Sequence, residues 1–396
     1  MTFKIRLRMG RCLTGAATAV VVGAGLLGAG ALGAGVASAS TAGAVAGQQS
    51  AAPAVTVPWA SVGTGWLLTR YSTGTVSKPE PTTLYLVSPS GAKYAIDTWK
   101  AGAQVPSVIA WAGNKTQALL YVSVPRTNAP AVAKYSELNL KTGKQTALTL
   151  AGNAYPLGYT LPTGQQILGE TANPDGNANA KITLARYTQA GKLVKALITE
   201  KGYGISALYA PNGAALALAA PAAVSLLSNA GGTPKKLPVP GVNPSFDCSP
   251  VRWWNASTIL ADCEPKNDLD IPQLWLVPAS GAKPSALTPV RKSGADLGDI
   301  DAWQLSSGLY LQSLGACGSL EINKQASNGS ITPVTVPGTN QSPIVVTASS
   351  SRLLVRTGGC FNGGELVWFN PGTRAEQWLF KTGVQEVTAY TNEENA

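Results

Sequence analysis

Acidic residues crowd one stretch of the chain and are its strongest candidates for chemistry. Eight of the 20 acidic residues fall within residues 247–301, including Asp262 and Asp301. Carboxylates in such a group could bind a polar ligand, hold a cation, or serve as acid and base in a glycosidase or lyase. The ligand-binding residues that we predict are the other six, Asp247, Glu264, Asp268, Asp270, Asp296 and Asp299.

One segment of this stretch has enough oxygen ligands for calcium, which prefers roughly six to eight of them on a bent loop. The segment lacks the glycine of a calcium-loop motif, so a solvated polar loop is the favoured interpretation and no cofactor is expected. The calcium candidates are Asp262, Glu264, Asn267, Asp268 and Asp270.

Other catalytic chemistry is largely excluded by residue type. The chain contains no histidine, which rules out Ser-His-Asp and Cys-His triads and histidine-bound zinc. It also lacks a Gly-x-Ser-x-Gly motif, a phosphate loop and a sialidase-type Ser-x-Asp-x-Gly-x-x-Trp box. We therefore assign no catalytic residue.

Four of the five cysteines lie beyond residue 40 and predict disulfide bonds. Cys248 and Cys263 bracket a hairpin that we expect to turn at Asn255-Ala256, so counting outward places them opposite each other. Opposed residues in antiparallel strands lie about 4.5–5.5 Å apart, which a disulfide can bridge. Cys317 and Cys360 are paired by their equivalent repeat positions and by elimination. A zinc site is the weaker alternative, because no Cys-x-x-Cys unit occurs.

A hairpin with a glycine in its turn recurs seven times along the chain. The fold that these repeats build must position the residues described above. Each unit alternates apolar and polar residues around a tight turn, as antiparallel strands do. Successive turn glycines are 40 to 52 residues apart, a period typical of β-propeller blades. The turn glycines are Gly91, Gly143, Gly191, Gly231, Gly281, Gly329 and Gly372.

Two further strands precede most of these hairpins, so the predicted fold class is all-β: a β-propeller of seven four-stranded blades, with six or eight as alternatives. Residues 386–390 resemble one more first strand, and we expect them to pair with the first blade and close the ring. The acidic residues and the four cysteines then share one loop face. Aromatic residues before the tight turns should pack between blades: Trp111, Tyr159, Tyr209, Trp254 and Trp303.

The segment Tyr209-Ala-Pro-Asn-Gly-Ala-Ala-Leu resembles the aromatic-Ser-Pro-Asp-Gly-x-x-Leu repeat of TolB-like and WD-repeat-like bacterial propellers. The resemblance implies a propeller over residues 58–391 that binds proteins or small ligands at its channel mouth. It does not extend to the N-terminal α/β domain of TolB, because we see no room for that domain before residue 58.

The first residues resemble an export signal. Basic residues precede an uncharged apolar stretch at 16–36, and Ala37-Ser38-Ala39 fits a cleavage site, with Ala44-Val45-Ala46 as a second possibility. We expect secretion, with a retained membrane anchor as the alternative. The expected organisation is a signal peptide at 1–39, a flexible linker at 40–57, the propeller at 58–391 and a C-terminal tail at 392–396.

The number and distribution of charged residues indicate which classes of partner the chain can bind. It has 30 basic and 20 acidic residues, and the basic residues form no runs, which argues against nucleic acid as a partner. We expect a monomer without a membrane span after cleavage. The predicted function is a secreted, non-catalytic β-propeller that binds a protein or an envelope glycan through its loop face. The alternatives are a carbohydrate-active enzyme that uses loop-face carboxylates, and a structural surface spacer.

Overall fold

A computed structural model describes residues 56–390, apart from short gaps at 76, 127–128, 174–176, 203, 266–270, 291–295, 316–318, 339–341 and 358–363. The predicted signal peptide and C-terminal tail lie outside the described residues, as do Asn267, Asp268, Asp270, Cys317 and Cys360. The domain boundaries therefore stay predictions. Within the described ranges, no helix has the length and apolar character needed to cross a membrane.

The described residues form antiparallel strands and two short 3-10 turns, η1 (Trp59–Ser61) and η2 (Ala151–Asn153). The predicted all-β propeller fold is confirmed. Three of the sheets have four strands each, and in each of them hydrogen-bonded neighbours are consecutive in the chain. Their strands are β4 (Ser107–Ala110), β5 (Gln117–Arg126), β6 (Ala129–Asn139) and β7 (Gln145–Leu148); β8 (Ala154–Tyr159), β9 (Gln166–Thr171), β10 (Lys181–Thr188) and β11 (Leu193–Lys201); and β20 (Asp296–Leu305), β21 (Gly308–Gly315), β22 (Leu320–Gln325) and β23 (Ile331–Pro333).

A fourth sheet joins two such groups of four. The link is short, because only Ala220 and Pro221 pair with Cys248 and Asp247 across it. The strands are β12 (Ala207–Tyr209), β13 (Ala215–Pro221), β14 (Ala223–Ser228) and β15 (Lys235–Pro238), followed by β16 (Asp247–Asn255), β17 (Thr258–Cys263), β18 (Gln273–Pro278) and β19 (Ser285–Ala286).

The fifth sheet joins the two ends of the propeller. Its strands are β24 (Ile344–Ala348), β25 (Leu353–Arg356), β26 (Gly364–Phe369) and β27 (Glu376–Ala389), then β1 (Leu67–Tyr71), β2 (Thr82–Val87) and β3 (Lys93–Trp99). The first part of β27 pairs with β26 and its last part with β1, where Leu67 lies opposite Ala389. The predicted closing strand is therefore confirmed, and it covers the edge that β1 would otherwise expose.

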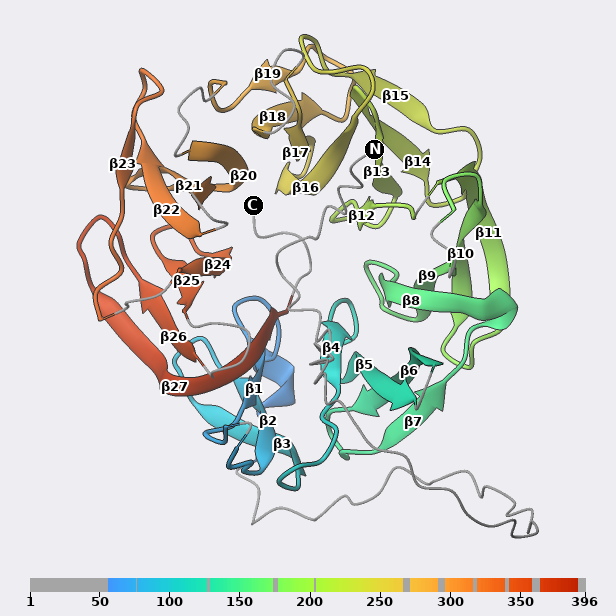
Figure 1. Cartoon of the computed structure of the whole chain (residues 1–396), viewed down its shortest axis with the longest axis vertical. Coiled ribbons are helices and arrows are strands. Elements are labelled where there is room, and N and C mark those ends of the chain that lie inside the picture. The colour runs from blue at the N-terminus through green and yellow to red at the C-terminus, as the bar shows by residue number, and fades with distance from the viewer. Residues whose placement is uncertain are drawn as a thin grey trace, which may run out of the picture. The chain divides into compact units, whose positions relative to one another are not determined.

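If β27 is counted once in each part, the strands fall into seven four-strand groups; because hydrogen bonding itself gives five sheets, the blade number stays a prediction. In Figure 1 the groups follow one another in chain order, with first strands such as β8 near the centre and fourth strands such as β11 at the rim. The first strands are β4, β8, β12, β16, β20, β24 and the last part of β27. The second strands are β5, β9, β13, β17, β21, β25 and β1.

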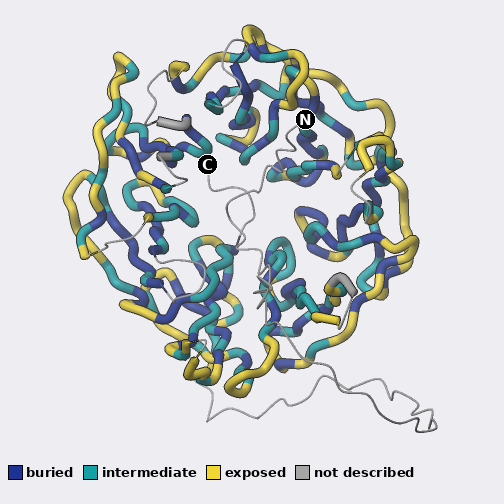
Figure 2. Tube along the Cα trace, viewed as in Figure 1, coloured by how far each residue is buried: buried dark blue, intermediate teal, exposed yellow. Residues whose placement is uncertain are grey.

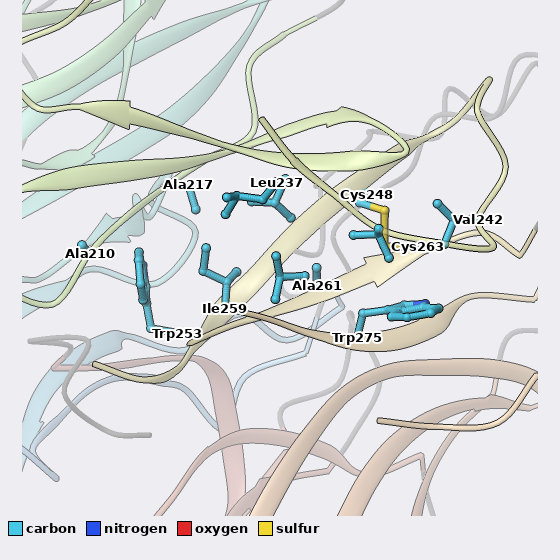
Figure 3. Close-up of a cluster of buried hydrophobic side chains, with 13 residues drawn as sticks. Ala210, Ala217, Leu237, Val242, Cys248, Trp253, Ile259, Ala261, Cys263 and Trp275 are labelled. Carbon is cyan, nitrogen blue, oxygen red and sulfur yellow. A yellow bond between two sulfur atoms is a disulfide. The ribbon is translucent and has the colours of Figure 1, made fainter. Parts of the chain in front are cut away.

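The apolar core lies between neighbouring groups. Buried segments run through the middle of the strands, whereas the outer strands and turns are exposed (Figure 2). One cluster between β12–β15 and β16–β19 includes Trp253, Trp275 and the Cys248–Cys263 disulfide (Figure 3). The prediction that aromatic residues pack between blades is confirmed for Trp111, Tyr159, Tyr209 and Trp303, which are buried. It is also confirmed for Trp254, which is half-buried and packs against the cluster between β16–β19 and β20–β23, whereas its neighbour Trp253 is buried in the cluster toward β12–β15.

The hairpin that carries the disulfide differs from the prediction in one detail. Cys248 and Cys263 are bonded, with Cα atoms 4.3 Å apart, as predicted. The turn, however, is one residue later than expected, because Asn255 pairs with Thr258. Register shifts on β16 absorb the difference, and Trp253 and Trp254 pack into the clusters on the two sides of this group.

Six of the seven predicted turn glycines adopt positive φ angles, from Gly143 at 68° to Gly91 at 92°. At Gly191 a side chain is also excluded by contact, since a Cβ atom there would lie 1.9 Å from the Thr149 carbonyl oxygen. Gly372 is the exception: in its turn the left-handed residue is Arg374, with φ of 62°. The hairpin repeat thus depends on left-handed turn residues, mostly glycine.

Candidate functional site at the ends of the second strands

In six of the seven groups, the second strand has a polar residue at the same place in the repeat. It follows a largely apolar triplet, such as Leu67-Leu68-Thr69 or Ile167-Leu168-Gly169. In six groups the residue lies opposite a first-strand residue in the register, for example Arg70 opposite Glu386 and Gln312 opposite Asp301. We call these the layer residues: Arg70, Tyr121, Glu170, Ala219, Asp262, Gln312 and Arg356.

Several layer residues bond to the first strand of the next group. The Gln312 amide donates to the Pro343 carbonyl (3.1 Å) and accepts from the Val345 N–H (2.9 Å). Glu170 accepts from the N–H of Ile205, just before β12, at 2.7 Å. These bonds satisfy backbone groups that have no ladder partner, so the layer residues join one group to the next.

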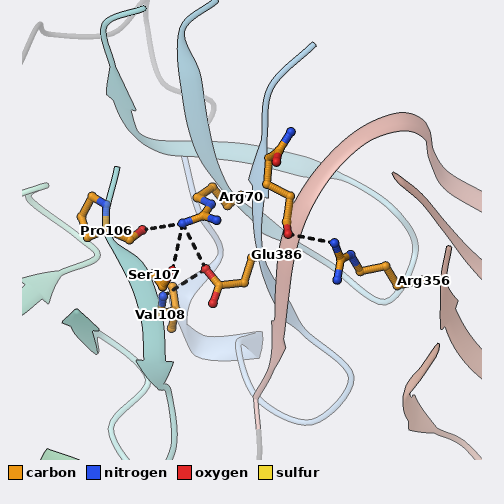
Figure 4. Close-up of polar contacts among 7 residues, drawn as sticks. Arg70, Pro106, Ser107, Val108, Arg356 and Glu386 are labelled. Atoms are coloured by element: carbon orange, nitrogen blue, oxygen red, sulfur yellow. Dashed lines mark hydrogen bonds and ion pairs between the residues drawn. The ribbon is translucent and has the colours of Figure 1, made fainter. Parts of the chain in front are cut away.

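The two arginine layer residues lie on either side of the last part of β27 (Figure 4). Arg356 Nη2 donates to the Gln385 carbonyl at 3.0 Å. Arg70 Nη1 lies 3.5 Å from Glu386 Oε2 and donates to the Pro106 carbonyl at 3.1 Å. Burial lowers the pKa of Arg356; Glu386 opposes this shift and Arg70 adds to it. The guanidinium groups of Arg70 and Arg356 therefore both contact the last part of β27, one from each side.

On the first strands β16 and β20, Arg252 and Asp301 form an ion pair of 3.2 Å, with 21% and 26% of their side chains exposed. Arg252 also lies over the rings of Trp303 (4.9 Å) and Trp254 (5.6 Å). Burial raises the pKa of Asp301, and this outweighs the opposing effects of Arg252 and of the Ala302 N–H. Perturbed carboxyl groups of this kind are common at functional sites.

A third polar cluster combines tyrosine and glutamate. The Tyr155 hydroxyl donates a short hydrogen bond to Glu170, and the Tyr159 hydroxyl donates to Glu137 at 2.7 Å. Burial raises the pKa of both glutamates, although the tyrosine hydrogen bonds oppose it. Glu170 is 3% exposed, so this cluster serves the contact between groups.

The predicted ligand-binding residues occupy varied environments. Asp247 begins β16 and is exposed, Glu264 follows β17 and is buried, and Asp299 is fully buried and accepts a hydrogen bond of 2.8 Å from Ser313. Asp296 begins β20, and Asp268 and Asp270 lie outside the described residues. A common ligand-binding role for the six stays a prediction.

The calcium hypothesis also stays untested. Of its five candidates only Asp262 and Glu264 are described. The described part of the chain contains no group of three histidine, cysteine or acidic residues placed to hold a metal ion. The Cys317–Cys360 pairing likewise concerns residues outside the described ranges.

Sequence reasoning missed the layer residues Arg70, Glu170, Gln312 and Arg356. A signal for them exists, because each follows an apolar triplet at the same place in the repeat. Aligning the seven second strands on their hairpins would have shown one position that is polar in six of the seven strands.

No protein-family model matches the chain, and no curated protein matches it. Solved structures do match. A prolyl endopeptidase matches with a TM-score of 0.53 and 12% identity, over 83% of this chain and 51% of that one. The β-propeller domain of the Trilobed protease from Pyrococcus furiosus matches with a TM-score of 0.50 and 13% identity, over 81% of this chain and 99% of that one. A TolB from Acinetobacter baumannii matches with a TM-score of 0.43 and 10% identity, over 83% of each chain.

At these identities the matches show the β-propeller fold. The chain spans about half the length of the peptidases that it matches. No property of TolB is assigned to this chain, and the resemblance to TolB-like propellers rests on the sequence pattern around Tyr209.

The predicted function, a secreted non-catalytic propeller that binds a protein or envelope ligand, is wrong in the light of these matches. The matching structures include a prolyl endopeptidase, a puromycin hydrolase and the propeller of a protease, so the enzyme alternative is better supported. The prediction that the protein is non-catalytic depended on the absence of histidine and of nucleophile motifs from the sequence. Their absence excludes histidine-dependent chemistry but leaves carboxyl chemistry open.

Proposed function

We propose that this protein is an enzyme, a hydrolase or lyase, whose acid–base chemistry is provided by carboxyl groups where β17 meets β20. The fold likeness to peptidases and a puromycin hydrolase supports an enzyme. The lack of histidine then assigns proton transfer to other groups, of which carboxyls are the usual choice in glycosidases.

The main structural support for this proposal is the irregular pairing of β20 with β21. Its register with β21 shifts twice, between Asp296 and Asp299 and again between Asp299 and Asp301. Such β-bulges re-aim side chains and are over-represented next to active sites. Asp301 follows the second shift, pairs with Arg252 of the neighbouring group and is partly exposed.

The proposed roles follow from the environments of two carboxyls. Asp301 is the proton donor, because burial raises its pKa and keeps the acid form present to higher pH. Asp262, a half-buried layer residue of β17, is the second carboxylate, which takes a proton from water or substrate. Glycoside cleavage uses an acid and a second carboxylate about 5–9.5 Å apart, so the proposal requires Asp262 and Asp301 to lie within that range.

A glycan is the proposed substrate class. Trp254 is half-buried and lies beside Arg252, the partner of Asp301. The indole packs against the cluster between the two groups, and its exposed part offers an apolar face with a polar N–H to a ligand. The peptide-cleaving neighbours make peptides the second substrate class to test.

The experiment is a turnover screen with the full chain on chromogenic glycosides, cell-envelope glycans and peptide substrates. We expect Asp301→Asn and Asp262→Asn each to reduce kcat by about a hundredfold or more while the fold is kept. Glu321→Gln, at an exposed site on β22, is the control and should retain activity. Undiminished turnover by folded Asp301→Asn protein would refute the proposed acid.

We also propose that the protein works outside the cytoplasm. The Cys248–Cys263 disulfide supports this location, because disulfides persist in oxidising compartments. The predicted export signal points the same way. Fractionation of cells that express the tagged chain tests it, and a wholly cytoplasmic product would contradict it.

A further inference from the structure

A polar cavity of about 210 Å³ lies between the group β8–β11 and its neighbour β12–β15 (Figure 1). It meets the end of the apolar cluster between these two groups and shares Leu161 with that cluster. The strand β9 begins here with Gln166, whereas its layer residue Glu170 lies near the other end. The cavity is therefore separate from the layer residues and from Asp262 and Asp301. Its polar lining residues are Thr160, Thr163, Gln165, Gln166, Arg186 and Asn229.

Arg186 is the charged residue of this lining. It lies on β10, where Ile182 and Leu184 are buried in the cluster between the two groups. Alternation along a strand places these three side chains on one face, so the guanidinium group enters the contact between the groups. It has no hydrogen bond or ion pair with any residue that the structure describes. Only its Nε atom is buried without a bond, which leaves the two Nη atoms accessible at the cavity.

A second positive charge lies beside Arg186. Lys195 of β11 is directly opposite it in the register, and like charges at opposed positions destabilise a sheet. On the other side its register partner is Leu168, which is buried and apolar. Within the described ranges, no acidic residue lines the cavity or forms an ion pair with either cation. The protein therefore leaves a positive charge at this cavity that it does not neutralise.

The other hairpins show that the fold does not require this arginine. In five hairpins the turn glycine donates to the carbonyl three residues earlier, as Gly191 does to Thr188. The residue five positions before that glycine is a leucine in three of these hairpins, namely Leu86, Leu226 and Leu276. In a fourth it is Lys324, which lies over the ring of Tyr310 at 5.8 Å. Arg186 is the charged residue at this place that lacks a partner within the described chain.

From these observations we infer that the cavity beside Arg186 binds a small polar molecule that bears a carboxylate or a phosphate group. A guanidinium group presents paired donors that match these oxyanions. The Thr163 hydroxyl and the Gln165 amide also have no partner among the described residues, so they can bond to polar groups elsewhere on the ligand. Drug-sized ligands occupy sites of roughly 300–1,000 Å³, so the ligand of this smaller cavity is a smaller molecule.

The test is a calorimetric and thermal-shift titration of the full chain with sodium glucuronate and with glucose 6-phosphate, against sodium chloride at equal ionic strength. We expect one or both probes to bind with a Kd on the order of millimolar or tighter, and to raise the melting temperature. The two arms distinguish a carboxylate from a phosphate ligand. Glucose lacks the charged group and should bind at least about tenfold more weakly; equal binding of glucose would contradict the role of Arg186.

Arg186→Gln should weaken binding by about tenfold or more. It should melt no lower than the unchanged protein, because it also removes the like-charge pair with Lys195. Gln165→Ala changes an exposed lining residue, so it should keep the fold and weaken binding about threefold or more.

The matched control is Lys181→Gln. Lys181 lies on the same strand as Arg186, is opposite Lys201, and does not line the cavity, so this variant should bind normally. Undiminished binding by folded Arg186→Gln protein would overturn the inference, as would undiminished binding by Gln165→Ala if the arginine variant does not fold. Absence of binding by either probe up to about 50 mM would also overturn it.

Discussion

The ring closure around β27 and the junction of β17 with β20 use the same repeat position in opposite ways. At the closure the layer residues are Arg70 and Arg356, and the groups are joined by a strand from the end of the chain. At the junction the layer residue is Asp262, on the hairpin that the Cys248–Cys263 disulfide links. The fold therefore fixes where the layer side chains lie, whereas the residue type at this position differs from one group to the next.

The largest expected effect concerns the closure. Tyr390 is buried, packs edge-on against Trp111 at 4.9 Å, and donates its N–H to the Trp66 carbonyl. Tyr390→Ala should lower the free energy of unfolding by about 3–5 kcal/mol. Denaturant unfolding measures this, with Phe246→Ala, at a side chain 38% exposed, as the control. A loss as small as that of the control would mean that the last part of β27 does not close the ring.

The β16–β17 hairpin should depend on its disulfide, which lies in the cluster toward β12–β15. Cys248→Ser with Cys263→Ser opens a loop of 15 residues and should cost about 3 kcal/mol by chain entropy. The same change in unfolding free energy should follow when the unchanged protein is reduced. A double variant as stable as the oxidised protein would show that the strand pairing alone holds the hairpin.

A smaller effect tests the joining role of the layer. Gln312→Ala leaves the Val345 N–H and the Pro343 carbonyl without their side-chain partner and should cost about 1–3 kcal/mol. Gln312→Glu keeps an acceptor and loses the donor, so its cost should be intermediate. If alanine costs no more than glutamate, the backbone groups of β24 have found other partners.

The smallest effect is a pH dependence at Glu170. Burial raises the pKa of Glu170 above its ordinary value of 4.5, so the folded protein holds this proton more tightly than the unfolded chain does. Its contribution is present below pH 4.5 and is lost as pH rises through the raised pKa, with a slope of up to about 1.4 kcal/mol per pH unit. Glu170→Gln should flatten this slope in pH-dependent unfolding, whereas the exposed-site change Glu321→Gln should not. An unchanged slope in Glu170→Gln would assign the proton elsewhere.

Much of the fold could be predicted, because its determinants are local. Turn glycines, strand alternation and the spacing of Cys248 and Cys263 all act within about 15 residues of the chain. The closing strand at 386–390 could be predicted because it resembles the other first strands.

The candidate sites could not be predicted in the same way. Arg70 and Glu386 are 316 residues apart in the sequence, and only the register of β27 with β1 places them together. The bulges of β16 and β20 are equally hidden, because a single extra residue changes which side chains face the core. For that reason the sequence did not show that Trp253 is more deeply buried than its neighbour Trp254.

The most direct test is the unfolding free energy of the double variant Arg70→Gln, Arg356→Gln. If layer residues join neighbouring groups through hydrogen bonds alone, glutamine should support the fold at these positions as it does at position 312. We therefore expect a change within about 1 kcal/mol, as for a partly exposed ion pair. A loss of about 3–5 kcal/mol, typical of breaking a buried ion pair, would show instead that the arginine charges hold the ring together.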